Sequence, residues 1–211
     1  MDPPPPRVPS PLQIRKHAAI LDGARTIFLR DGFGGSSMDE VARAAGVGKQ
    51  TVYRHFGSKE ALFEDLLGEM CSGAFEAPVQ NAGSFAETLR EVGRSFISVV
   101  IDPINLALFR VVVAETERFP ALAQRFHAAT VTRAVTHVAD LIMRHTGLDE
   151  DRAQQLAATF LEMVKGPALL RLLLGASAAL WNASFERQTD QAVAYVMSQT
   201  VAHEGRRRGR A

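Results

Sequence analysis

The sequence predicts an all-α protein with a small N-terminal helical domain and a larger C-terminal helical domain. Ala, Leu, Arg and Glu are abundant, while the β-branched alternation typical of strands is scarce. Glycine-marked turns separate short helical segments up to about residue 57, and longer helical segments follow a loop near residues 77–83. At 211 residues with 46% hydrophobic content, the chain can bury one or two cores and is not wholly disordered.

The chain begins with a proline-rich segment and then the first helix. Residues 1–13 hold six of the ten prolines, which predicts a disordered arm with polyproline II character. A helix is expected over Ile14–Arg30, because Ile20, Ala24, Ile27 and Phe28 lie on one helical face. Asp31-Gly32 should end it.

The next segment has the pattern of a helix-turn-helix. Ser37 and Glu40 form a capping-box pair, which places a helix start at Met38. Gly46 stands where the end of a helix favours positive φ, and Gly46-Val47-Gly48 makes a three-residue turn before a helix at Lys49. The second helix of such a motif enters the DNA major groove, so the pattern predicts DNA binding.

The helix over Lys49–Phe56 is too short to be stable alone and needs Val52 and Phe56 packed inward. The side chains left outside can contact DNA: Lys49, Gln50, Thr51, Tyr53, Arg54 and His55. Gln50 can pair with adenine, Lys49 with guanine or phosphate, and Thr51 with a base edge or thymine methyl. The spacing does not decide which residues read bases, and His55 could instead cover the core beside Phe56.

A fourth helix should start after Ser58 as N-cap and carry an apolar stripe through Leu62, Phe63, Leu66, Leu67 and Met70. It links the first domain (residues 14–68) to the second (84–204), and residues 205–211 form a basic tail. Helices of the second domain are expected over Ser84–Ile101, Pro103–Arg118, Pro120–Thr146, Asp149–Gly175 and Arg187–Glu204. Gly166-Pro167 should kink the fourth of these.

A ligand pocket in the second domain would be lined by bulky or polar side chains on apolar helix faces. The candidates are Phe96, Phe109, Val113, Phe126, His127, Phe160 and Met163. For each of them taken singly, a role as an ordinary core residue is the favoured alternative.

The last two helices carry many apolar residues, among them Leu156, Phe160, Val164, Leu169, Leu172, Leu173, Leu180, Trp181, Val193, Val196, Met197 and Val201. This is more than a two-helix edge of a monomer is expected to cover, which predicts a two-fold homodimer through these helices. A monomer that buries the same residues internally is the alternative.

Several functions are disfavoured. No phosphate loop, metalloprotease motif, nucleophile elbow or metal-spaced His/Cys set occurs, so neither an enzyme nor a cofactor or metal site is predicted. Cys71 is the single cysteine, and no apolar run is long enough for a membrane helix, which together suit a cytoplasmic protein. Residues 1–57 carry eight Lys/Arg against five Asp/Glu, whereas residues 58–203 carry twelve against seventeen, which suits nucleic-acid contact by the first domain alone.

The run from Gly46 through Tyr53-Arg54-His55-Phe56 to Ser58-Lys59-Glu60-Ala61-Leu62-Phe63 resembles the N-terminal domain of TetR/AcrR transcriptional regulators. The resemblance covers residues 14–68. It implies that Ser36, Tyr53, His55 and Lys59 face DNA phosphates and that Lys49, Gln50 and Thr51 lie over base edges. The sequence departs from the common family pattern by having Gly48 in place of a capping serine and Gln50 in place of a small residue.

A second segment, Leu106–Pro120 with Leu122 and Phe126, resembles the C-terminal domain of the AefR-like subgroup. The two resemblances imply a dimeric repressor that binds a roughly palindromic operator and is released by a small, apolar effector. The alternatives are a helical small-molecule carrier that no longer reads an operator, and a ligand-dependent activator with the same residues.

Overall fold

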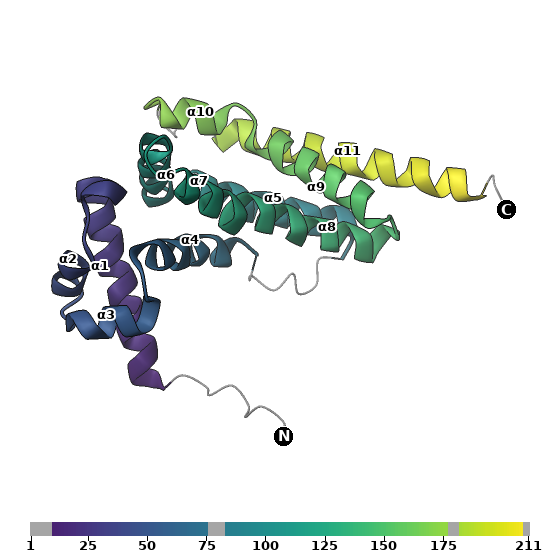
Figure 1. Cartoon of the computed structure of the whole chain (residues 1–211). Helices are drawn as coiled ribbons and strands as arrows, with labels where there is room; N and C mark the ends of the chain where they lie inside the picture. Colours follow the sequence, from purple (N-terminus) through teal and green to yellow (C-terminus); the bar gives the residue numbers. More distant parts are fainter. Residues whose placement is uncertain (1–9, 76–82, 177–181, 209–211) are drawn as a thin grey trace, which may run out of the picture. The chain divides into compact units, whose positions relative to one another are not determined.

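The computed structural model describes residues 10–75, 83–176 and 182–208, and all regular structure within these ranges is helical, as predicted (Figure 1). The chain divides into two compact units. No single helix of the described ranges is long and apolar enough to cross a membrane. The bent helix pair α5 (Phe85–Val100) and α6 (Pro103–Glu115) is long and apolar enough only when the two helices are taken together.

The first unit contains the residues up to Leu66 together with Val111–Ala123. Its helices are α1 (Pro11–Gly35), α2 (Met38–Ala44), α3 (Lys49–Phe56) and the first half of α4 (Lys59–Phe75). The core between them is aromatic: the rings of Phe28, Phe33 and Phe63 contact each other pairwise at centroid distances of 5.8, 5.1 and 5.4 Å. Ile20, Val41 and Val52 are fully buried around these rings.

The local signals at the helix ends behave largely as predicted. The Ser37 hydroxyl accepts the Glu40 amide at 3.3 Å, but it also donates to the Glu40 carboxylate, so the reciprocal bond goes to the hydroxyl and not to the Ser37 amide. Gly46 has φ 65°, and the Gly46 and Val47 amides donate to the Arg43 and Ala42 carbonyls, which is a Schellman end. The Ser58 hydroxyl caps α4 through the Ala61 amide.

The start of α1 differs from the prediction. A capping box between Ser10 and Gln13 starts the helix at Pro11, so residues 10–13 of the predicted arm are capped or helical. Residues 1–9 lie outside the described ranges. The helix also continues to Gly35, with a local break at Gly32 (φ 72°) near the predicted end.

The second unit comprises α5 (Phe85–Val100), the first part of α6 (Pro103–Glu115), the end of α7 (Pro120–His127), the π-helical turn η1 (Ala128–Thr132), α8 (Arg133–Thr146), α9 (Glu150–Lys165), α10 (Ala168–Leu173) and α11 (Asn182–Arg208). Helix α9 packs against α5, α8 and α11 (Figure 1). Helices α4 and α6 each contain residues of both units.

Four of the helices predicted after residue 84 differ in detail. The segment 120–146 is interrupted by η1, for which the sequence has no glycine or proline signal. The segment 149–175 is divided at Gly166 (φ 49°), where the predicted kink is a complete break. The last helix begins at Asn182 instead of Arg187, and α6 ends at Glu115 instead of Arg118.

The apolar residues from which a dimer was predicted are largely buried within the single chain. Leu156, Phe160, Val164, Val193 and Val196 are each at most 2% exposed, because α9 and α11 pack on each other and on α5. The premise of excess apolar surface is therefore wrong for these residues. Leu180, Trp181, residues 209–211 of the predicted tail and the side chains of Met70, Cys71 and Val201 lie outside what the structure describes.

Candidate DNA-binding surface and ligand pocket

Helix α3 presents a polar outer face on two buried anchors. Val52 is fully buried and Phe56 nearly so, and Gly57 (φ 73°) ends the helix. Its outer side chains are exposed or half-buried; they are Lys49, Gln50, Thr51, Tyr53, Arg54 and His55. Tyr53 is 44% exposed although it is aromatic, so its ring is available to an external partner.

Lys49 is held by an ion pair within the first unit. Its ammonium lies 2.8 Å from the Asp39 carboxylate, and this hydrogen bond raises the pKa of Lys49. The same ammonium lies 5.8 Å from the Tyr53 ring centroid. Both Lys49 and Asp39 are more than half exposed, so the pair is weak and a phosphate or guanine could compete for the ammonium.

Ser36 and Lys59 make internal contacts in this structure. The Ser36 hydroxyl, in a residue only 6% exposed, donates to the Phe33 carbonyl at 2.8 Å. The Lys59 ammonium donates to the Phe33 and Ser36 carbonyls at 2.7 and 2.9 Å and lies 4.5 Å from the Phe33 ring centroid. Burial lowers the pKa of Lys59. Lys59 thus ties α4 to the end of α1, while the Ser36 hydroxyl makes a local bond within that end.

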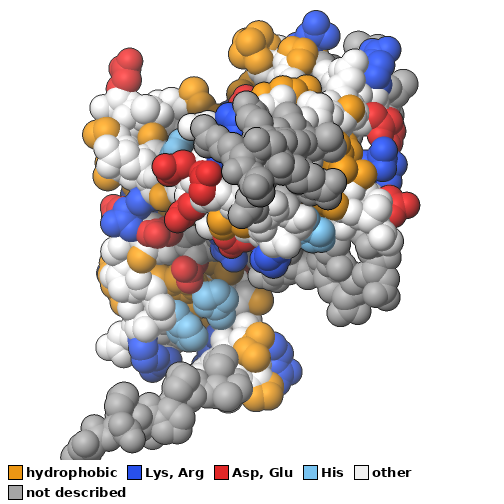
Figure 2. All heavy atoms as spheres, turned by 90° about the vertical axis from the view of Figure 1, so that its right-hand side faces the viewer, with side chains coloured by type: hydrophobic (Ala, Val, Ile, Leu, Met, Phe, Trp, Pro, Cys, Tyr) orange, Lys and Arg blue, Asp and Glu red, His pale blue; other side chains and the backbone are white. Residues whose placement is uncertain are grey.

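His55 lies next to a second histidine from α1. The His17 ring stacks on Phe56 at 5.0 Å and lies 6.4 Å from the His55 ring. Burial, followed by the nearby His17, Arg54 and Lys16, lowers the pKa of His55. Figure 2 shows histidine side chains side by side on the face that it draws. His55 therefore lies beside the core, as the alternative prediction has it, and its side chain is still partly exposed.

Residues far along the chain complete the first unit. The Gly34 amide donates to the Glu115 carboxylate at 2.8 Å, and the Phe119 ring packs edge-on against Phe33 at 5.3 Å. A Cβ on Gly34 would lie 2.9 Å from the Arg118 guanidinium, so glycine permits this close approach. Sequence reasoning missed Glu115 and Phe119, since no local signal pairs residues 81 positions apart.

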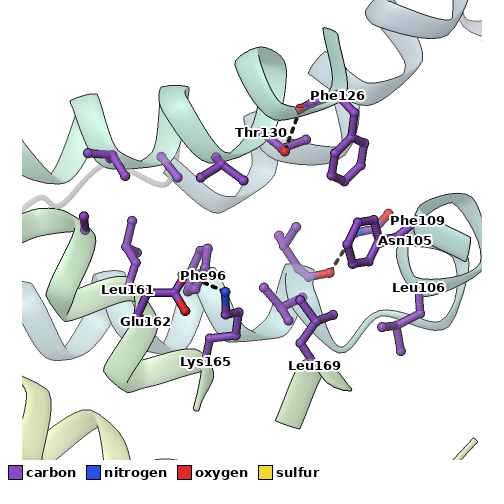
Figure 3. A pocket seen from close by; sticks show the side chains of 16 residues that line it. Phe96, Asn105, Leu106, Phe109, Phe126, Thr130, Leu161, Glu162, Lys165 and Leu169 are labelled. Carbon is purple, nitrogen blue, oxygen red and sulfur yellow. Dashed lines mark hydrogen bonds and ion pairs between the residues drawn. The ribbon is translucent and has the colours of Figure 1, made fainter. Parts of the chain in front are cut away.

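The second unit contains a cavity of about 200 Å³ between α5, α6, α7, η1, α8, α9 and α10 (Figure 3). Its lining is mainly aliphatic and aromatic, and consists of Phe96, Val99, Val100, Asn105, Leu106, Phe109, Phe126, Thr130, Val131, Ala134, Val135, Ala158, Leu161, Glu162, Lys165 and Leu169. Two of these come from the π-helical turn, and such turns are common at functional sites. The helix break at Gly166 directly follows the lining residue Lys165.

Three of the seven predicted pocket residues line this cavity, namely Phe96, Phe109 and Phe126. The other four do not. Phe160 is a fully buried core residue, Met163 packs against the same core, Val113 is 55% exposed and belongs to the first unit, and His127 is exposed. The apolar pattern of a helix cannot distinguish a face on a cavity from a face on a neighbouring helix, which explains the error.

The described residues include no group of three or more His, Cys, Asp or Glu side chains placed to hold a metal ion.

A model of the C-terminal domain of AefR-like transcriptional repressors matches residues 87–199, which is more than half of the chain. The model for bacterial regulatory proteins of the TetR family matches residues 20–66. The chain belongs to the TetR family. It is therefore a member of a family of transcriptional regulators and not of enzymes, as the sequence predicted.

Individual relatives agree with this assignment. The regulator AlkX of Mycobacterium tuberculosis is 30% identical over 43% of this chain and 45% of its own length. The activator FasR of Mycolicibacterium smegmatis is 29% identical over 67% of this chain and 65% of its own. The matched segment thus spans less than two thirds of these relatives. Among solved structures, the flavonoid-responsive regulator FrrA has a TM-score of 0.71 at 30% identity, covering 88% of this chain and 96% of its own.

Proposed function

We propose that this TetR-family chain is a homodimeric, sequence-specific DNA-binding repressor that a small apolar molecule releases from its operator. The observation that carries DNA reading is the outer face of α3, where Lys49, Gln50 and Tyr53 are exposed on an anchored helix. In this proposal Lys49, Gln50 and Thr51 read bases, and Tyr53, Arg54 and His55 contact phosphates. Ser36 and Lys59 then act through the α1 end that they hold, and a phosphate would reach Lys59 only in exchange for its carbonyl contacts.

The effector side of the proposal is supported by the apolar cavity and by helix α6. Asn105, Leu106 and Phe109 of α6 line the cavity, and Glu115 at the end of the same helix bonds the Gly34 amide. A ligand that displaces α6 would act on the contact at Glu115. A ligand can shift the population of DNA-binding conformations only by its difference in affinity between them. The name of FrrA, a flavonoid-responsive relative, is in keeping with an apolar effector.

Repression is favoured over activation because the AefR-like repressor model covers residues 87–199, from the first turn of α5 to most of α11. The relative FasR is an activator, so activation stays the second candidate, with the same DNA-contacting residues. A small-molecule carrier that no longer reads DNA is the third candidate. Cytoplasmic location is part of the proposal, since a chromosomal operator requires it.

Selection of binding sites from random duplexes tests the proposal. The full chain should enrich a roughly palindromic sequence, whereas a carrier would enrich none.

Gln50→Ala should alter preference at one base step of each half-site by about 1–3 kcal/mol. Tyr53→Ala should weaken operator and random DNA alike, by roughly 3- to 10-fold. Gln124→Ala, which removes an exposed glutamine of α7, is the matched control and should change neither.

Salt titrations of the same variants show which contacts are lost. If both α3 variants keep wild-type affinity and wild-type preference at every salt concentration, α3 is not the reading helix. Reporter assays with the operator upstream of or overlapping a promoter then separate repression from activation.

A further inference from the structure

The polar groups of the cavity are mostly hydrogen-bond acceptors. The Thr130 hydroxyl donates to the Phe126 carbonyl at 2.8 Å, which leaves its oxygen lone pairs for a ligand. The Asn105 amide nitrogen donates one of its two N–H groups to the Val99 carbonyl at 2.9 Å, which leaves the Asn105 side-chain oxygen as an acceptor beside the second N–H. Both residues line the cavity. A ligand that enters it should therefore bring a donor.

The cation in the lining is already paired. Lys165 is the single Lys or Arg among the lining residues, and its ammonium lies 2.6 Å from the Glu162 carboxylate. Figure 3 shows this pair together at one side of the cavity. Because the Glu162 side chain is 67% exposed, the ion pair itself is weak, and the cost to a ligand carboxylate comes mainly from desolvating its charge among the apolar groups that make up most of the lining. The lining therefore favours a neutral ligand over an acid.

The aromatic residues favour a planar ring. The Phe109 and Phe126 rings, from α6 and α7, are parallel within 10° at a centroid distance of 5.0 Å (Figure 3). A third ring can extend such a pair by stacking or by an edge contact. The volume of about 200 Å³ exceeds the roughly 150 Å³ that accommodates benzene in an engineered cavity. One ring with a short substituent fits that space.

We propose that the cavity of this chain binds a neutral aromatic alcohol, with the ring against Phe109 and Phe126 and the hydroxyl donating to Thr130 or Asn105. This deepens the proposed function, on which it rests, by naming the chemical class of the effector. Phenols with a short alkyl substituent are the simplest members of the class.

Titration calorimetry on the full chain with four probes tests the class. The probes are 4-propylphenol, its methyl ether 4-propylanisole, 4-propylbenzoate and 4-propylcyclohexanol. The phenol should bind most tightly. The ether should bind roughly 3- to 10-fold more weakly, because it lacks the donor. The cyclohexanol should lose a similar factor through the missing ring stacking. The benzoate should lose more than about tenfold, through its charge.

Variants locate the contacts. Thr130→Val or Asn105→Leu should reduce the preference for phenol over ether, and Phe109→Leu should reduce the preference for phenol over cyclohexanol. Thr159→Val is the matched control, since Thr159 of α9 makes the same bond to the carbonyl four residues earlier but does not line the cavity. Circular dichroism melting of each variant verifies folding.

Equal binding of the ether, tighter binding of the benzoate, or no binding of the phenol up to millimolar concentration would overturn the inference. So would an unchanged phenol-to-ether ratio in both the Thr130 and Asn105 variants. The outcome is separable from that of the proposed function. If no operator is selected but the phenol binds selectively, the proposal of a DNA-binding regulator is rejected and the phenol inference stands. An operator that is bound and released by another chemical class rejects the phenol inference alone.

Discussion

The contact between Glu115 and the Gly34 amide is the residue-scale link on which the DNA-binding unit depends. The carboxylate accepts a part-buried amide at 2.8 Å, and the chain around it brings Phe119 onto the Phe33 ring. A charged acceptor makes a stronger bond than a neutral one. If the Glu115 carboxylate is removed, the Gly34 amide has no partner but is still partly shielded from water, and this costs free energy.

Glu115→Ala should therefore lower the free energy of unfolding by about 1–3 kcal/mol. Glu117→Ala, two residues on and exposed, should change it by less than about 0.5 kcal/mol. Urea denaturation of the full chain, followed by circular dichroism, measures both. Equal losses in the two variants would show that the Gly34 contact contributes nothing.

The lowered pKa of His55 gives a pH dependence of stability. Because the folded-state pKa lies below the unfolded value near 6.5, the unfolded chain binds more protons between the two values. Stability attributable to His55 is therefore complete above pH 6.5 and falls as the pH drops toward the folded-state pKa. Phosphate contact would oppose this, because an anion favours the protonated ring.

His55→Gln should lose less stability than wild type when the pH is lowered from 7.5 to 5.5 in the absence of DNA. Chemical denaturation at the two pH values gives the comparison. The pKa of His137 is also lowered by burial, but His137 contributes equally to the pH-dependent loss of stability in both proteins, so its contribution cancels in the comparison. A wild-type loss no larger than that of the variant would contradict the assignment.

At the scale of the element, the turn between α2 and α3 contains two glycines with different roles. Gly46 has φ 65° and no atom within 4 Å of an added Cβ, so a side chain there meets only backbone strain. Gly48 has φ −70° and caps α3 without a side-chain hydrogen bond. The two positions should therefore respond to substitution with opposite signs.

Gly46→Ala should destabilise the chain by about 1 kcal/mol. Gly48→Ser should stabilise it by a few tenths of a kcal/mol, because serine can accept an amide of the first turn of α3. Thermal melts of the two variants beside wild type give the signs. Stabilisation by Gly46→Ala would mean that the positive φ at this turn carries no strain.

The elements that could be predicted from sequence are those whose ends carry local signals. Ser37, Gly46 and Ser58 mark helix ends through their own side chains or φ angles, and α3 has the bounds that were predicted. The π-helical turn has no such mark. The internal contacts of Ser36 and Lys59 depend on tertiary packing, as does the bond from Glu115. Periodicity found the apolar faces but not the neighbour that each face contacts, so four pocket candidates were misplaced.

At the scale of the whole molecule, the homodimer remains a proposal with a different basis from the one first predicted. Since the apolar residues of α9 and α11 are buried within the chain, an interface must use what α11 leaves exposed. The exposed residues Gln191, Ala194, Tyr195 and Ser198 follow the i, i+3, i+4, i+7 spacing of one helical face. In a two-fold interface each position of this face would meet the same helix of the partner.

Sedimentation at micromolar concentration should give twice the chain mass for wild type. Ala194→Arg should shift the equilibrium toward monomer, because a charge placed at the centre of a symmetric interface meets its own copy. Asp140→Arg, which introduces the same side chain at an exposed position of α8 and outside this face, is the control and should leave the dimer intact. Because two α3 helices must reach two half-sites, the Ala194 variant should also lose most of its operator affinity while keeping the weaker affinity for random DNA. A monomeric wild type would reject the palindromic operator together with the dimer.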